Sequence, residues 1–223
     1  FKEQRVGDFK GSFFRSITLA VIVMILTVVI SLAAGLAYRK SFKFSGAVFY
    51  ITVASLIVPS ILITLGIGLM FDRMDIEASW YTSGMGAHLT WTLPFGLLIM
   101  FAIFNRFDKS YEEAARDLGA TPWQVMRFVV IPIITPSLVG IGLFGFTLSF
   151  DEFARSLLSV GSKNTLPLEI FGMTTTVTTP TLYALGTLTT AVSFLIIGIS
   201  FSAIAVIERR RRRHGSDAGE GMV

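Results

Sequence analysis

Few residues of this 223-residue chain could make or break bonds. There is no cysteine, so disulfides, thiol chemistry and thiolate-bound metals are excluded. His88 has no cysteine or carboxylate beside it to complete a metal-ligand set. Gly140, Gly142 and Gly145 match a dinucleotide-binding pattern, but they follow no predicted strand and lie inside an apolar run. We therefore expect no catalytic residue, no metal and no cofactor, and any ATP must be bound by another chain.

Two adjacent carboxylates, Asp151 and Glu152, are the side chains best suited to attract a solute. They follow an apolar run directly, and neighbouring negative charges at such a point focus an electric field that draws in cations. On this interpretation they are candidates for a substrate pathway that admits a polyamine or a similar small cation. The other interpretation is a pair of solvated acids at the membrane surface, and the sequence leaves both open.

A charged block at 105–127 carries the clearest local signals. Residues 111–118 favour a helix, with acids early and Arg116 late, as the helix dipole prefers. Gly119 is suited to end that helix, because glycine accepts the left-handed cap conformation. The block therefore begins with a short helix and a tight turn.

A second short helix is predicted directly after the turn. Thr121 and Gln124 have the spacing of a capping box, and Pro122 occupies the first helical position. Ala114 and Ala115 leave the first helix thin on one side, so it could enter a groove on a partner protein. An ordinary solvated loop is the alternative, but a loop needs neither a glycine stop nor a capping box.

The elements around these residues are membrane spans. The chain is 52% hydrophobic and only 15% charged, with a mean hydropathy of +0.69, which excludes a soluble enzyme, a disordered region or a nucleic-acid-binding domain. A spanning helix needs about 20 consecutive apolar residues. Five runs qualify, so we expect an all-α polytopic membrane bundle with spans at 16–38, 46–71, 86–104, 132–150 and 182–207.

Details within the spans predict bends and a membrane-interface residue. Pro59 and Pro94 lie inside expected spans, where proline favours a kink. His88 lies near Trp91 at the start of the third run, and we expect both in the aromatic belt at the outer membrane surface.

The distribution of basic residues predicts the orientation. Most Lys and Arg flank the spans on one side, in the segment after Tyr38, in the 105–127 block and in the run Arg209 to Arg213. The positive-inside rule makes that side cytoplasmic, together with a basic tail at 208–223. The opening segment 1–15 then lies outside, as an interfacial helix or a solvated linker. With the N-terminus outside, we expect a sixth span before Phe1.

The block also resembles the EAA motif of inner-membrane permeases of ABC importers. The family pattern E-A-A-x-x-x-G-x(9)-I-x-L-P is matched outright at five positions, and Val129 and Ile131 are apolar replacements; the matching residues are Glu113, Ala114, Ala115, Gly119 and Pro132. The stretches 146–153 and 166–170 further resemble the second permease subunit of spermidine/putrescine-type transporters.

This resemblance implies a mechanism and a set of partners. The helices at 109–129 would couple to an ABC nucleotide-binding subunit, with Glu113 as the polar anchor, Ala114 and Ala115 as a close-packing surface and Gly119 as the turn. A second permease subunit would complete the pathway in a bacterial inner membrane, and a periplasmic solute-binding protein would deliver the solute. Membrane lipid is the remaining partner, and nucleic acid is not expected. A stand-alone secondary carrier or channel is the alternative, although no charged residue lies within the spans to bind a coupling ion.

Overall fold

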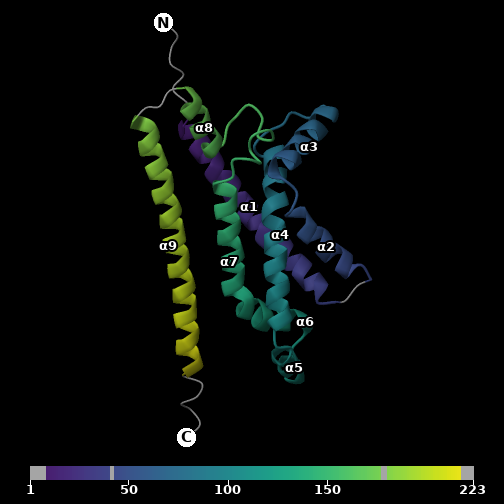
Figure 1. Ribbon diagram of the computed structural model, residues 1–223. Helices are drawn as coiled ribbons and strands as arrows, with labels where there is room; N and C mark the ends of the chain where they lie inside the picture. Colours follow the sequence, from purple (N-terminus) through teal and green to yellow (C-terminus); the bar gives the residue numbers. More distant parts are fainter. Residues whose placement is uncertain (1–8, 41–42, 177–179, 217–223) are drawn as a thin grey trace.

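The computed structural model describes residues 9–40, 43–176 and 180–216, and their regular structure is helical (Figure 1). One isolated antiparallel bridge, between Ser79 and Gly161, is the single extended pairing in this part of the chain. The helices are α1 (Phe9–Tyr38), α2 (Ser45–Ser55), α3 (Ser60–Arg73), α4 (Ser83–Arg106), α5 (Ser110–Asp117), α6 (Pro122–Val125), the π-helix η1 (Met126–Val130), α7 (Ile131–Phe150), α8 (Leu166–Thr176) and α9 (Pro180–Ser216).

The core forms where α1 crosses α4 and α7 (Figure 1). Small residues permit the crossing: a Cβ on Gly96 of α4 would lie 3.0 Å from Thr27 Cγ2, and one on Gly142 of α7 would lie 3.2 Å from Val28 Cγ2. Thr27 also donates a hydrogen bond of 2.8 Å to Thr92 between α1 and α4. Close approach of small residues is the usual basis of helix packing in membranes.

Three helices are long and apolar enough to cross a membrane: Lys10–Tyr38, Ser83–Arg106 and Pro122–Phe150. A fourth span results if α2 and α3 together count as one. The polytopic helical class is thus confirmed, whereas five spans are not reached among the described residues. The fifth expected span, 182–207, falls within α9. The side chains of several α9 residues lie outside the described part of the structure.

The expected second span, 46–71, is not one continuous helix. α2 and α3 are bent by 103° at the break between Ser55 and Ser60. Pro59 precedes α3 in an extended conformation, with φ −56° and ψ 131°. Proline also disfavours helical geometry at the residue before it, which explains why a helix ends here instead of kinking. Pro94, by contrast, remains inside α4.

The boundaries of two other spans differ from the prediction. α1 begins at Phe9 and therefore extends back into the 1–15 segment, of which residues 1–8 lie outside the described part. The fourth span was expected to start at Pro132, but helix continues from Pro122 to Phe150 through η1. Pro132 has no N–H to donate to the carbonyl four residues earlier, and Ile131 N–H instead bonds to Met126 O in the wider π pattern.

Candidate functional site

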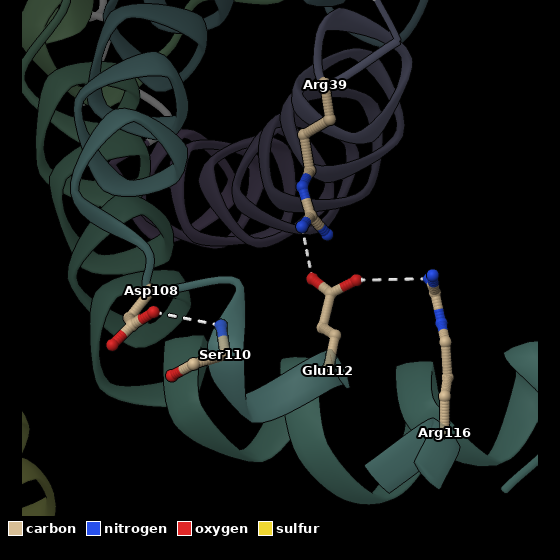
Figure 2. A network of polar contacts seen from close by, with 5 residues as sticks. All are labelled: Arg39, Asp108, Ser110, Glu112 and Arg116. Atoms are coloured by element: carbon tan, nitrogen blue, oxygen red, sulfur yellow. Dashed lines mark hydrogen bonds and ion pairs between the residues drawn. The ribbon is translucent and has the colours of Figure 1, made fainter. Parts of the chain in front are cut away.

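The first helix of the charged block is closed at both ends by local hydrogen bonds. Asp108 Oδ1 accepts a bond of 2.9 Å from Ser110 N–H at the start of α5 (Figure 2). This bond keeps the pKa of the Asp108 carboxyl below its usual value. At the other end, Gly119 N–H donates to Arg116 O at 2.8 Å and Ala120 N–H to Ala115 O at 3.0 Å. These two bonds form a Schellman motif, and Gly119 has φ +85°, so its predicted role as the helix stop is confirmed.

The second helix begins with the predicted capping box. Thr121 N–H donates to Gln124 Oε1 at 2.8 Å, and Gln124 N–H donates to Thr121 Oγ1 at 3.4 Å. Pro122 follows at the first helical position. A tight turn therefore holds α5 and α6 together at one end of the molecule, where α4 ends and η1 leads into α7 (Figure 1).

The side chains of α5 divide into a bundle-facing set and an exposed set. Ala115 packs against the core cluster that contains Met100, Val125 and Val130. Ala114 is exposed, so the two alanines of the motif point in different directions. We call the solvent-exposed set at this end the exposed tip; it comprises Tyr111 (56% exposed), Glu113, Ala114, Leu118 (90%) and Trp123 (67%).

The buried acid of α5 is Glu112, which the sequence reasoning missed. Its side chain forms an ion pair with Arg39 just beyond α1, and its second oxygen lies 3.5 Å from Arg116 Nη2 (Figure 2). Glu112 is 9% exposed, whereas neighbouring Glu113 is open to solvent. A signal was available, because Glu112 shares a helical face with Ala115 and Arg116 at spacings of three and four.

The candidate pathway acids Asp151 and Glu152 lie beyond the other end of α7 and differ from each other. Glu152 Oε1 accepts a bond of 2.9 Å from Arg155 N–H, and Glu152 O accepts one of 2.7 Å from Ser156 Oγ. Asp151 is exposed, and its carboxylate makes no hydrogen bond within the described residues. Partial burial raises the pKa of Asp151 above its usual value. Asp151 is therefore the acid that remains available to a solute.

Two further polar residues near this end are buried inside the bundle. Arg155 is fully buried, with its guanidinium 4.6 Å from the ring centre of Trp91 and Nη1 3.2 Å from Thr90 Oγ1. His88 was expected in the outer interface belt, but it is 1% exposed and bonds to Ser149 Oγ at 2.8 Å and to Ser156 Oγ at 3.0 Å. His88 thus joins α4 to α7 and the following loop. Its polar ring is accommodated inside the bundle because both nitrogens have partners.

A polytopic helical bundle with a capped helix pair at one end is the architecture of a membrane transport permease. The sequence pattern of the "binding-protein-dependent transport system inner membrane component" family matches residues 27–214. The chain belongs to this family, and it is the transmembrane permease subunit of an ABC importer. A stand-alone carrier or channel is thereby set aside. Permeases of this family span the inner membrane several times, carry no cofactor and catalyse no reaction, and they pair with an ATPase subunit.

Curated relatives give a more specific likeness. The chain is 32% identical over 187 residues to the spermidine/putrescine transport system permease protein PotC of Haemophilus influenzae, covering 83% of this chain and 72% of the relative. It is 28% identical over 215 residues to the putrescine transport system permease protein PotI of Escherichia coli, covering 92% and 76%.

Solved structures share the fold. A chain of the MetNI methionine ABC transporter in an inward-facing conformation superposes with a TM-score of 0.70 at 17% identity, over 89% of this chain and 94% of that one. A chain of an amino acid ABC transporter crystallised with histidines superposes with a TM-score of 0.62 at 18% identity, over 91% and 93%. These likenesses support the all-helical permease fold.

Proposed function

We propose that α5 and α6 are the coupling helices, through which conformational changes of the ATPase subunit are transmitted to this permease subunit. The observation that carries the proposal is the exposed tip, which presents Tyr111, Leu118 and Trp123 to solvent at an end of the molecule far from Asp151. Exposed aromatic and aliphatic side chains gathered beside charged ones are typical of a protein–protein contact. Glu113 lies among them and supplies the polar anchor expected from the motif.

The geometry of the helix pair suits transmission of force. The Schellman turn and the capping box fix α5 against α6, and helix continues from α6 through η1 into α7. A displacement of α5 would therefore be transmitted to the spanning helix α7 without an intervening flexible loop. Gly119 supplies the turn, and Pro132 lies at the junction of η1 with α7.

The orientation and span count are part of the same proposal. The C-terminal end of α9 lies at the same end of the molecule as α5 (Figure 1). We place this end in the cytoplasm, in agreement with the positive-inside rule. With α2 and α3 as one broken span and α9 as another, the described residues would supply five spans. We propose an outer segment at 1–15, into which the start of α1 extends, a permease domain at 16–207 and a basic tail at 208–223.

We further propose a polyamine or similar small cation as the solute. The relatives PotC and PotI are named as spermidine/putrescine and putrescine permeases. Asp151 is an available carboxylate at the outer end, where a periplasmic solute-binding protein would deliver its cargo. A second permease subunit would complete the pathway between two bundles.

Changing the charge of the exposed tip tests the proposed coupling site. Glu113→Lys and Leu118→Asp are compared with Glu77→Lys, an exposed acid in the α3–α4 loop at the opposite end. The ATPase subunit should co-purify poorly with the two tip variants and normally with the control. Normal yield of the ATPase subunit with both tip variants, together with intact stimulated ATP hydrolysis, would contradict the coupling role.

A further inference from the structure

Arg39 lies where three elements meet at the cytoplasmic end. It follows Tyr38, the last residue of α1. Its guanidinium carbon is 5.0 Å from the ring centre of Phe104 in the last turn of α4 and 5.2 Å from that of Phe107, just beyond α4. Both distances fall within the range of a cation–π contact, so the end of α1 is tied to the end of α4 through this one side chain.

The same guanidinium pairs with Glu112 of α5, as Figure 2 shows. The side chains of Arg39 and Glu112 are only 17% and 12% exposed. A carboxylate with so little access to water needs a close opposite charge, because an unpaired buried charge is strongly destabilising. Arg116 is a weaker second partner, since it lies farther away and its own side chain is 59% exposed.

α5 has few other attachments to the bundle. It is eight residues long, too short to be stable by itself in water, so tertiary contacts must hold it. Among the described residues, α5 lies against α6 and η1, Ala115 packs on the core cluster, and the Arg39–Glu112 ion pair reaches α1. The turn at Gly119 connects α5 to α6 and so to α7, whereas the ion pair of Glu112 with Arg39 connects α5 to the end of α1.

We propose that the Arg39–Glu112 ion pair transmits displacement of α5 to α1 and α4, which makes Arg39 a positioning residue for energy coupling. The proposal rests on the proposed function, in which α5 docks on the ATPase subunit. The two adjacent acids of α5 then have separate tasks: Glu113 contacts the partner subunit, and Glu112 connects α5 to the bundle. The alternative is that the ion pair stabilises the fold and has no part in coupling.

A double-mutant cycle on the assembled complex separates these possibilities. The variants are Arg39→Gln, Glu112→Gln and the double variant, with Arg39→Lys as the conservative substitution and Arg116→Gln as the matched control. Three quantities are measured for each: co-purification of the ATPase subunit, thermal stability, and the ATP-dependent change in distance between spin labels. Since the chain has no cysteine, labels can be placed on cysteines introduced at Phe14 and Tyr81, which are both exposed.

The expected results follow from the chemistry of the pair. Each single Gln variant leaves one charge buried and should lower thermal stability, and the double variant should recover much of it because neither charge remains. In all three variants, the fraction of molecules whose label distance changes on addition of ATP should nevertheless fall about tenfold or more. This factor is typical of the coupling between two sites. Arg39→Lys and Arg116→Gln should retain the shift, and the ATPase subunit should co-purify throughout.

Two outcomes would overturn the inference. One is a normal ATP-dependent distance change in Arg39→Gln. The other is recovery of that change along with stability in the double variant, which would make the pair structural only. Failure of the proposed function would look different, because the ATPase subunit would then co-purify normally even when the exposed tip carries Glu113→Lys and Leu118→Asp.

Discussion

Among single residues, Gly119 has the most restricted conformation in the candidate site. Its φ of +85° is unfavourable for residues with a Cβ, although no atom lies within 4 Å of where a Cβ would be. The left-handed conformation costs an L-residue about 1–2 kcal/mol, and more for a β-branched one. Gly119→Val should therefore uncouple ATP hydrolysis from uptake without preventing membrane insertion, as measured in proteoliposomes.

Asparagine provides the control for that substitution. It tolerates the left-handed conformation far better than valine, so Gly119→Asn should keep most of the coupling. Equal activity of the Val and Asn variants, both at the unsubstituted level, would show that the turn has no coupling role.

Asp151 predicts a dependence of uptake on external pH. Its raised pKa means that it loses its charge at a higher pH than a fully hydrated aspartate would. The ionised form therefore costs folding stability above that pKa, and the cost disappears as the pH falls through it. Attraction of a cation by Asp151 is lost over the same pH range. Two unit charges 4 Å apart in water interact by about 1 kcal/mol, which corresponds to an about fivefold change in the affinity for the cation.

At neutral pH, uptake of labelled spermidine by Asp151→Asn should accordingly be a few-fold lower than uptake by the unsubstituted protein. The pH dependence that comes from protonation of Asp151 should be absent in this variant. Glu152→Gln serves for comparison and should keep the pH dependence, because Glu152 already accepts a bond from Arg155 N–H. An unchanged pH profile in Asp151→Asn would indicate that Asp151 is only a solvated surface acid, and the polyamine assignment would then rest on the relatives alone.

The candidate site could be predicted from sequence as far as local chemistry determines it. The glycine stop and the capping box depend on residues within a few positions of each other, and both were found at Gly119 and Thr121. The division of labour between Glu112 and Glu113 could not be read in the same way. It depends on Arg39, which is 73 positions away from Glu112 and reaches α5 only through the packing of α1 on α4.

Among the elements, the π-helix η1 sets the rotation of α6 relative to α7. Pro132→Ala restores an N–H that can donate to the carbonyl of Phe128, which favours an ordinary α-helix through this stretch. Reversion would rotate α5 and α6 by about 100°, one residue of an α-helix. The variant should insert normally but stimulate the ATPase subunit poorly; full stimulation would show that the π geometry does not matter.

The crossing of α1 and α4 predicts a difference between two glycines. A Cβ at Gly96 would lie 3.0 Å from Thr27 Cγ2 and closer still to Ser31 Oγ, whereas Gly140 in α7 has no atom within 4 Å of its Cβ position. Gly96→Leu should cost about 1–3 kcal/mol through overpacking. Gly140→Ala should be neutral or stabilising, since alanine is favoured over glycine in a helix by about 1 kcal/mol.

Thermal unfolding in detergent compares the two variants. For a chain of this size, each kcal/mol shifts Tm by about 2–4 °C, so Gly96→Leu should unfold several degrees earlier. Equal Tm values for the two variants would contradict the close crossing of α1 and α4.

Element types were predictable because apolar runs of this length must be helical in a membrane. Element boundaries were not, for identifiable reasons. The sequence is apolar on both sides of Pro59, so hydropathy does not reveal the 103° break between α2 and α3. Likewise, Pro132 was expected to begin a span. Instead, a π-helical turn precedes it, and the helix runs without a break from Pro122 to Phe150.

For the whole molecule, the two ends have different proposed tasks. One end carries the exposed tip with the Arg39–Glu112 pair behind it, and the other carries Asp151 at the end of α7. The helices between them are tied by the small-residue crossings and by the hydrogen bonds of His88. Displacement at one end can therefore change the bundle at the other, as alternating access requires.

Site-specific cross-linking tests most directly whether the exposed tip is the contact with the ATPase subunit. Because the chain has no cysteine, Leu118→Cys and Tyr81→Cys each introduce a single reactive thiol, one at the tip and one at the opposite end of α4. In the assembled complex, Leu118→Cys should cross-link to the ATPase subunit and Tyr81→Cys should not. No cross-link from Leu118→Cys in a complex that still contains the ATPase subunit, or an equal one from Tyr81→Cys, would contradict the account.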